Sequence, residues 1–318
     1  MRKMLRRSIL IILILGSATV SAQIPTADHH QHLFSPMMAE FQKITPITAA
    51  DVIKLLDEAG IKRGVLLSTA YAYGRPGREP KNEYEKVKEE NDWVAAEAAK
   101  FPKRLIAFCG FNPLKEYALE ELARCANNPN KHRGIKLHFG NSDVQLEKPE
   151  HIEKLKAVFR AANENRMAIV VHMRASISLN RPYGAEQVRA FLDQLMPLTA
   201  KIVVQVAHLV GSGPGFNDSK QDAALDGFVE AIQNSKSKAP NNLWFDLTTS
   251  AHPSNTPERT TALLKRIRQI GVRRILYGTD AALGSNLKPK ESWAEVTKIG
   301  LTFPELKTIA NNRAPYWR

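Results

Sequence analysis

Four histidines and one aspartate each stand at the carboxyl end of a short apolar run. They are His30, His32, His172, His208 and Asp280. Imidazole and carboxylate groups are common ligands of divalent metal ions, and buried polar groups need partners. A single histidine in this position is usually a core residue whose ring nitrogens have hydrogen-bond partners. Five in this position, spread over four separate runs, indicate that they converge on one metal site.

The first two histidines alternate along one extended segment. In a strand, alternate side chains share a face and alternate Cα atoms lie about 6.6 Å apart. We therefore expect Asp28, His30 and His32 on one face, with His29 and Gln31 on the other. Two imidazoles at this spacing reach one ion at about 2.0 to 2.1 Å per bond. Asp28 either orients a ligand or has a structural place lower in the fold.

The elements that must position these residues follow a regular order, in which eight β-like runs alternate with amphipathic helical stretches. The expected strands lie near residues 26–33, 61–69, 104–111, 133–139, 167–173, 200–209, 242–249 and 272–280. This alternation predicts a parallel sheet with right-handed crossovers, and eight repeats close into a (β/α)8 TIM barrel of the α/β class. The alternative, an open doubly wound sheet, is disfavoured because no Gly-x-Gly-x-x-Gly turn follows the first run.

A barrel of this kind presents its chemistry at the carboxyl ends of its strands, which is where the five residues stand. The last stretch of the chain, 303–318, is expected to be a closing helix over the outer wall of the barrel.

The first 22 residues have the features of a secretory signal peptide. Basic residues precede the apolar run Ile9–Leu15, and small residues follow up to Ala22, after which we expect cleavage. The apolar run is shorter than the about 20 residues of a membrane span, so we expect no stable membrane insertion after cleavage. An uncleaved anchor is the alternative. The rest of the chain, 23–318, is then one catalytic barrel domain that is periplasmic or secreted.

The formal net charge of +13 is basic but not patterned. Lysines and arginines are spread among glutamates, without the basic run or aromatic ladder of a nucleic-acid groove. We therefore expect a small-molecule substrate and no nucleic-acid partner. A homo-oligomer is compatible with the sequence.

The chain has two cysteines, Cys109 and Cys125. Two are too few for a structural zinc finger or a dense disulfide framework. Export would permit one bridge between them, but we expect two free, buried thiols.

Several of these motifs together resemble a known family. They are Asp28-x-His30-x-His32, Gly134-Ile135-Lys136-Leu137-His138, His172, His208 and Gly278-Thr279-Asp280. The set resembles the amidohydrolase superfamily and, more narrowly, its amidohydrolase-related branch of lactonases, other hydrolases and metal-dependent decarboxylases. The resemblance implies that His208 stands beside the metal-bound water and that the other four are metal ligands. Those four are His30, His32, His172 and Asp280.

The chemistry of these groups predicts the same type of enzyme. Neutral imidazole and carboxylate suit one Zn²⁺ or a similar divalent ion, with a position left open for water. The ion lowers the pKa of that water from about 15.7 towards about 7. Asp280 can then accept the proton, and His208 can donate to the developing oxyanion. We predict a metal-dependent hydrolase that attacks a lactone, ester or amide with metal-bound hydroxide.

Two alternatives remain. In the first, the same metal holds an unsaturated or aromatic acid for non-oxidative decarboxylation. In the second, the barrel binds a ligand without catalysis, although such a protein would more readily have lost some of the five residues.

Lys136 affects the number of metal ions. The resemblance implies that a carbamylated lysine on the fourth strand bridges two ions in binuclear members. We favour an unmodified Lys136 that holds a substrate anion or pairs with an acid, because a carbamate needs an unprotonated amine in a confined site.

The loops that follow the strands give weaker indications of the substrate. The residues we expect to contact it are Tyr71, Lys136, Arg174 and His252, and the same loops also carry Tyr73, Arg75, Arg181 and Tyr183. Aromatic surface beside guanidinium groups favours a small organic substrate with a carboxylate, which arginine binds with two parallel hydrogen bonds.

Overall fold

The structure is a computed structural model that describes residues 23–234, 241–282, 284 and 286–317. The expected signal peptide, 1–22, and its cleavage point lie outside the described residues. Within the described part, no helix is both long and apolar enough to span a membrane.

Eight parallel strands form the barrel, and each pairs with the next one along the chain. They are β1 (Asp28–Gln31), β2 (Gly64–Leu67), β3 (Leu105–Gly110), β4 (His132–His138), β5 (Ala168–His172), β6 (Val204–Val206), β7 (Leu243–Asp246) and β8 (Ile275–Leu276). Just beyond β8, backbone bonds from His29 N to Tyr277 O (2.9 Å) and from Asp280 N to His30 O (2.7 Å) join the last strand to the first. The predicted (β/α)8 barrel is confirmed, with strands at all eight expected places, and all of them except β4 are shorter than expected.

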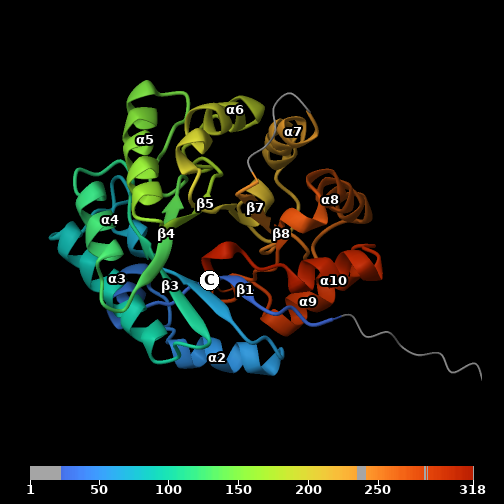
Figure 1. Ribbon diagram of the computed structural model, residues 1–318, viewed down its shortest axis with the longest axis horizontal. Helices are drawn as coiled ribbons and strands as arrows, with labels where there is room; N and C mark the ends of the chain where they lie inside the picture. Colours follow the sequence, from blue (N-terminus) through green and yellow to red (C-terminus); the bar gives the residue numbers. More distant parts are fainter. Residues whose placement is uncertain (1–22, 235–240, 283, 285, 318) are drawn as a thin grey trace, which may run out of the picture.

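Helices surround the barrel (Figure 1). They are α1 (Pro36–Gln42), α2 (Ala49–Glu58), α3 (Glu83–Ala99), α4 (Ala118–Ala126), α5 (Pro149–Glu164), α6 (Ala185–Gln194), α7 (Ser219–Gln233), α8 (Pro257–Ile270), α9 (Pro289–Lys298) and α10 (Phe303–Asn311). Side chains cap several of them. Thr48 and Asp51 form a capping box at α2, for example, which satisfies backbone N–H groups that the helix leaves free.

The end of the chain does not follow the expected course. The predicted closing helix ends at Asn311, and a short 3₁₀ turn, Pro315–Trp317, crosses the amino-terminal end of the barrel. The C-terminus accordingly lies over the middle of the ring in Figure 1. Asn312 turns the chain, because its side-chain amide donates to two backbone carbonyls, those of Val272 (2.7 Å) and Ile275 (2.6 Å). Tyr316 then packs below the barrel, with its ring 5.1 Å from that of Phe108.

The first strand departs from simple alternation. Its pairing with β2 shifts register between Asp28 and Gln31. The Gln31 amide donates to the Asp28 carboxylate at 2.7 Å, so the prediction that these two side chains lie on opposite faces is wrong. Asp28 also accepts from the Thr279 hydroxyl (2.6 Å) and the His30 backbone N–H (3.0 Å). Its carboxylate therefore joins β1 to the segment after β8.

The expectation of two free thiols is also wrong. Cys109 on β3 and Cys125 on α4 form a disulfide, with Cα atoms 6.3 Å apart. Both residues are fully buried in the layer between the barrel and the helices. The outward side of β3 and the inward face of α4 bring the two side chains together, a contact that sixteen residues of sequence separation do not reveal.

Candidate metal centre

Three residues from three strand ends meet at the barrel mouth. His30 on β1, His208 after β6 and Asp280 after β8 present ligand atoms that lie within 4.8 Å of one another, and all three are buried. His32 joins them, since its Nε2 lies 3.5 Å from Asp280 Oδ1. The structure thus brings together four of the five residues singled out in the sequence.

The fifth, His172, lies beside the group. Its ring centroid is 5.0 Å from that of His208, and its ring stacks on His138 at 3.9 Å. His138 ends β4 and pairs in register with His172 at the end of β5. The sequence pointed to His138 only as part of a motif, although it ends its strand in the same way as the others.

Hydrogen bonds fix the orientation of two of these rings. His30 Nδ1 lies 3.2 Å from the Asp246 carboxylate, and His32 Nδ1 lies 2.6 Å from the Leu67 carbonyl oxygen. Because each Nδ1 donates its proton to an oxygen, each Nε2 keeps its lone pair. This is the tautomer that a metal ligand needs.

Asp246, at the end of β7, is the residue that sequence reasoning missed. Besides His30, its carboxylate accepts from Gln205 Nε2 (2.7 Å) and from the His208 backbone N–H (2.8 Å). Burial alone would raise the pKa of this carboxyl, but the neighbouring His30 and His208 and the hydrogen bonds from His30 and Thr248 hold the pKa well below its usual range. The apolar run Leu243–Asp246 ends in a polar side chain, as the other runs do. The signal was hidden because the predicted strand continued to residue 249.

His208 is held in an unusual backbone conformation. Its φ of 57° lies in the left-handed region, which a non-glycine residue adopts only where its surroundings enforce it. Its Nδ1 lies 3.4 Å from the Thr249 hydroxyl, which itself donates to the Gly213 carbonyl at 3.0 Å. The imidazole is therefore the donor to Thr249, and its Nε2 carries the lone pair. This favours a proton-accepting or ligating His208 over one that donates to an oxyanion.

Burial keeps all the imidazoles at the mouth neutral. It lowers the pKa of His30 to about 4 and that of His208 to about 3. The pKa values of His32, His138 and His172 lie well below the ordinary value for the same reason. Neutral imidazole is the form that binds a metal ion.

Lys136 and Asp280 show that this site suits a cation. The Lys136 ammonium is buried on β4 and lies 3.3 Å from His30 Nε2, facing the lone pair that would bind a metal. Asp280 Oδ1 is buried without a hydrogen-bond partner among the described residues. Burial lowers the pKa of Lys136 and raises that of Asp280. Neutral imidazoles and a carboxylate oxygen without a described partner are groups that bind a divalent metal ion. The Lys136 ammonium beside them shows that the same place attracts a positive charge.

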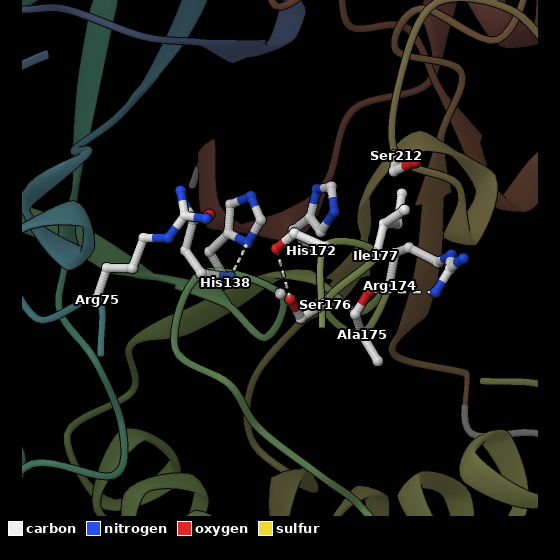
Figure 2. Close-up of a pocket in the computed structure, with 11 residues that line it drawn as sticks. Arg75, His138, His172, Arg174, Ala175, Ser176, Ile177 and Ser212 are labelled. Carbon is white, nitrogen blue, oxygen red and sulfur yellow. Dashed lines mark hydrogen bonds between the residues drawn. The ribbon is translucent and has the colours of Figure 1, made fainter. Parts of the chain in front are cut away.

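A cavity of about 270 Å³ opens beside these residues, with His138 and His172 in its wall (Figure 2). Arg75 and Arg174 also line it, on either side of the two histidines in this view. Ile177, which is 58% exposed, adds an apolar surface. Charged, polar and apolar groups at one mouth suit a small organic anion.

The residues expected to contact a substrate lie in different surroundings. Tyr71 is buried with its ring 5.0 Å from that of His138. Arg174 lines the cavity, but its guanidinium pairs with Asp218 and lies over the Tyr183 ring at 4.8 Å. His252 bonds to a neighbouring hydroxyl on the loop after β7 and is not among the residues that line the cavity.

Arg75 is the more available cation. It is partly exposed, and no carboxylate within the described ranges forms an ion pair with it. From the sequence we placed it on a loop near the mouth but expected Arg174, not Arg75, to contact the substrate.

The sequence matches the amidohydrolase family over residues 27–308. The chain therefore belongs to this family, as the motifs at the strand ends suggested. No curated protein sequence matches it.

Several solved structures share the fold. The 2,6-dihydroxybenzoate decarboxylase from Rhizobium is 17% identical, with a TM-score of 0.60 over 90% of this chain and 96% of that one. A 5-carboxyvanillate decarboxylase from Novosphingobium aromaticivorans, solved with manganese and a nitrobenzoic acid, is 14% identical, with a TM-score of 0.61 over 93% and 96%. A protein described as a "probable 2-pyrone-4,6-dicarboxylic acid hydrolase" from Acinetobacter baumannii is 18% identical, with a TM-score of 0.58 over 89% and 95%. At these identities the likeness concerns the fold.

Proposed function

We propose that this protein is a metal-dependent hydrolase that adds water to the carbonyl carbon of a lactone, ester or amide in a small organic acid and breaks its acyl C–O or C–N bond. The observation that carries the proposal is the meeting of His30, His208 and Asp280 at the barrel mouth, beside a cavity lined by Arg75, which forms no ion pair with the carboxylates of the described residues. Family membership supports an enzyme of the amidohydrolase type.

Four residues would hold one divalent ion, which we propose to be Zn²⁺. They are His30, His32, His172 and Asp280. The ion would supply Lewis-acid polarisation of the substrate carbonyl and would acidify a water molecule. Lys136 would stay unmodified, and its bond to His30 Nε2 would give way to the ion.

The protein's own groups would then move the proton. Asp280 Oδ1, which has no hydrogen-bond partner in the described part of the chain, is free to take a proton from the attacking water and return it to the leaving group. His208 Nε2, with its lone pair facing the site, would accept a hydrogen bond from the same water and orient it. Asp246 would keep His30 and the His208 backbone in place during this exchange.

Arg75 would bind the carboxylate of the substrate. A guanidinium without a competing carboxylate can form two parallel hydrogen bonds to the substrate, whereas that of Arg174 is already bonded to Asp218. Ile177 would cover the apolar part of the molecule.

The second candidate function is non-oxidative decarboxylation of an aromatic or unsaturated acid. The similar barrels from Rhizobium and Novosphingobium are decarboxylases, and one was solved with manganese. In that reaction the ion and Arg75 would hold the substrate acid while Asp280 would donate a proton to carbon.

One experiment separates the two reactions. The purified enzyme is given a panel of lactones, esters, amides and aromatic acids, and the release of protons and of carbon dioxide is followed in parallel. For the hydrolase we expect no carbon dioxide, with proton release from a lactone or ester and amine release from an amide. Carbon dioxide production would identify the decarboxylase. Export to the periplasm or medium stays a prediction, which sequencing the amino terminus of the exported protein would test.

A further inference from the structure

A second group of metal-binding side chains lies away from the barrel mouth. Cys109 on β3, Cys125 on α4 and His132 at the start of β4 present ligand atoms that lie within 4.8 Å of one another. All three are buried. The proposed reaction uses none of them.

The hydrogen bonds of the described residues give the His132 side chain no structural role. It is 6% exposed, and neither ring nitrogen has a hydrogen-bond partner among the residues that the structure describes. An imidazole hidden from water without a partner is unfavourable, and a bound metal ion would supply that partner. Burial, helped by the nearby Arg124, lowers the pKa of His132 to about 4. The ring is therefore neutral at neutral pH, as a metal ligand must be.

A buried carboxylate lies against the two sulfurs, outside this group of three. Glu121 lies one helical turn before Cys125 on α4 and is fully buried. Its Oε1 lies 3.3 Å from Cys125 Sγ and 3.7 Å from Cys109 Sγ. Asn91 and Arg124 hold it there through hydrogen bonds of 2.7 Å and 2.8 Å. Two sulfurs, one imidazole and one carboxylate make the number and type of ligands of a tetrahedral zinc site.

We propose that Cys109, Cys125 and His132 bind one Zn²⁺ when the disulfide is reduced, with Glu121 as the fourth ligand. A dithiol reductant would transfer two electrons and two protons to the disulfide and would itself become a disulfide. Zn²⁺ would then replace the two thiol protons, which pass to solvent. The oxidised bridge and the bound ion exclude each other, because a disulfide sulfur is no longer a thiolate.

The spacing of the backbone allows both states. The two Cα atoms lie 6.3 Å apart. Thiolates on one tetrahedral ion, at about 2.3 Å per bond, lie about 3.8 Å from each other. The sulfurs must separate by about 2 Å relative to a disulfide bond, which rotation about the Cα–Cβ bonds can provide.

Co²⁺ absorption distinguishes this site from the proposed metal site at the barrel mouth. The folded protein is reduced with a dithiol, freed of reductant without oxygen and titrated with Co²⁺ in an absorption spectrometer. Thiolate-to-cobalt charge transfer is expected to saturate at one equivalent for this site and to disappear when excess Zn²⁺ is added. The residues proposed as ligands at the mouth include no cysteine, so cobalt there gives no such band.

Matched variants assign the ligands. The double variant Cys109→Ser, Cys125→Ser should lose the band, and His132→Ala should weaken Co²⁺ binding tenfold or more. Asp280→Asn should leave the band unchanged, which separates this site from the proposed catalytic one. Circular dichroism checks that each variant folds, and His132→Gln replaces His132→Ala if the latter does not.

Three results would overturn the proposal. The first is a reduced protein with two titratable thiols and no charge-transfer band. The second is equal Co²⁺ affinity in the wild type and in a folded His132 variant. The third is a bridge that stays closed in the folded protein under the dithiol, which thiol titration and mass measurement would reveal.

Discussion

Replacing Asp246 with asparagine should weaken metal binding at the barrel mouth about 10- to 100-fold. Four hydrogen bonds end on this carboxylate. Oδ1 accepts from the backbone N–H groups of His208 (2.8 Å) and Thr248 (3.2 Å), and Oδ2 accepts from Gln205 (2.7 Å) and from His30 Nδ1 (3.2 Å). An asparagine amide has one acceptor oxygen and one NH₂ donor. Whichever way the amide turns, the NH₂ group replaces one of the two oxygens, and the two hydrogen bonds that ended on that oxygen are lost.

The pair that includes His30 determines the size of the effect. If Nδ1 loses its acceptor, the proton can move to Nε2, which then has no lone pair for a metal ion. A hydrogen bond to a charged group contributes about 1.5 to 3 kcal/mol, and tenfold in affinity corresponds to about 1.4 kcal/mol. The expected loss is therefore of the same size as that found when other carboxylates behind metal-bound histidines are removed.

A chelator competition assay measures this affinity, with Asp28→Asn as the matched control. Asp28 is an equally buried aspartate of the same barrel. Its carboxylate accepts hydrogen bonds from Gln31, Thr279 and the His30 backbone N–H but from no imidazole ring. The control should lower the free energy of unfolding but leave metal affinity within about threefold. Wild-type affinity in Asp246→Asn, or an equal loss in Asp28→Asn, would refute the reasoning.

Four further predictions follow from the structure. The purified protein should contain about one equivalent of a divalent ion, and its removal by a chelator should abolish turnover until the ion is restored; full activity without metal would contradict the proposed function. Asp280→Asn should lower kcat by about 10² to 10⁴ even with metal bound, and an unchanged kcat would remove its role in proton transfer. Arg75→Gln should raise KM about 10- to 100-fold for a substrate with a carboxylate but not for its neutral methyl ester, whereas Arg181→Gln, whose guanidinium pairs with a nearby carboxylate, should change neither value. Burial raises the pKa of Glu90 to about 7, above its ordinary 4.5, so the folded state binds an extra proton between these values and stability falls as pH rises from about 4.5 to about 7. Glu90→Gln should remove this fall and should increase stability at pH 8 by up to about 3 kcal/mol, because a pKa difference of one corresponds to about 1.4 kcal/mol; a pH dependence of unfolding equal to that of the wild type would contradict this.

The barrel could be predicted from the sequence because its signals are local. Each strand is a short apolar run, most helices show an amphipathic periodicity and several carry a capping residue, so the alternation is visible without knowledge of any distant contact. The rule that strands of such a barrel end at one mouth then brought together residues from opposite ends of the chain, as the contact of His30 with Asp280 illustrates.

Features that depend on exact strand ends or on contacts between elements could not be predicted from the sequence. Asp246 was missed because the expected strand ran three residues too far, to 249. The Cys109–Cys125 bridge and the position of His132 beside it depend on how α4 packs against β3 and β4, which no spacing in the sequence encodes.

The end of the chain shows why such contacts matter for chemistry. Tyr316, which the sequence placed on the outer wall, donates from below the barrel to Gln205 Oε1 at 2.7 Å. Gln205 Nε2 in turn donates to Asp246, and Asp246 accepts from His30 Nδ1. One line of buried hydrogen bonds therefore runs from the C-terminal turn through the barrel interior to a residue at the mouth. Because each bond fixes the donor and acceptor roles of the next, the turn that closes the bottom of the barrel also helps to set the tautomer of His30, and with it the lone pair that a metal ion would use.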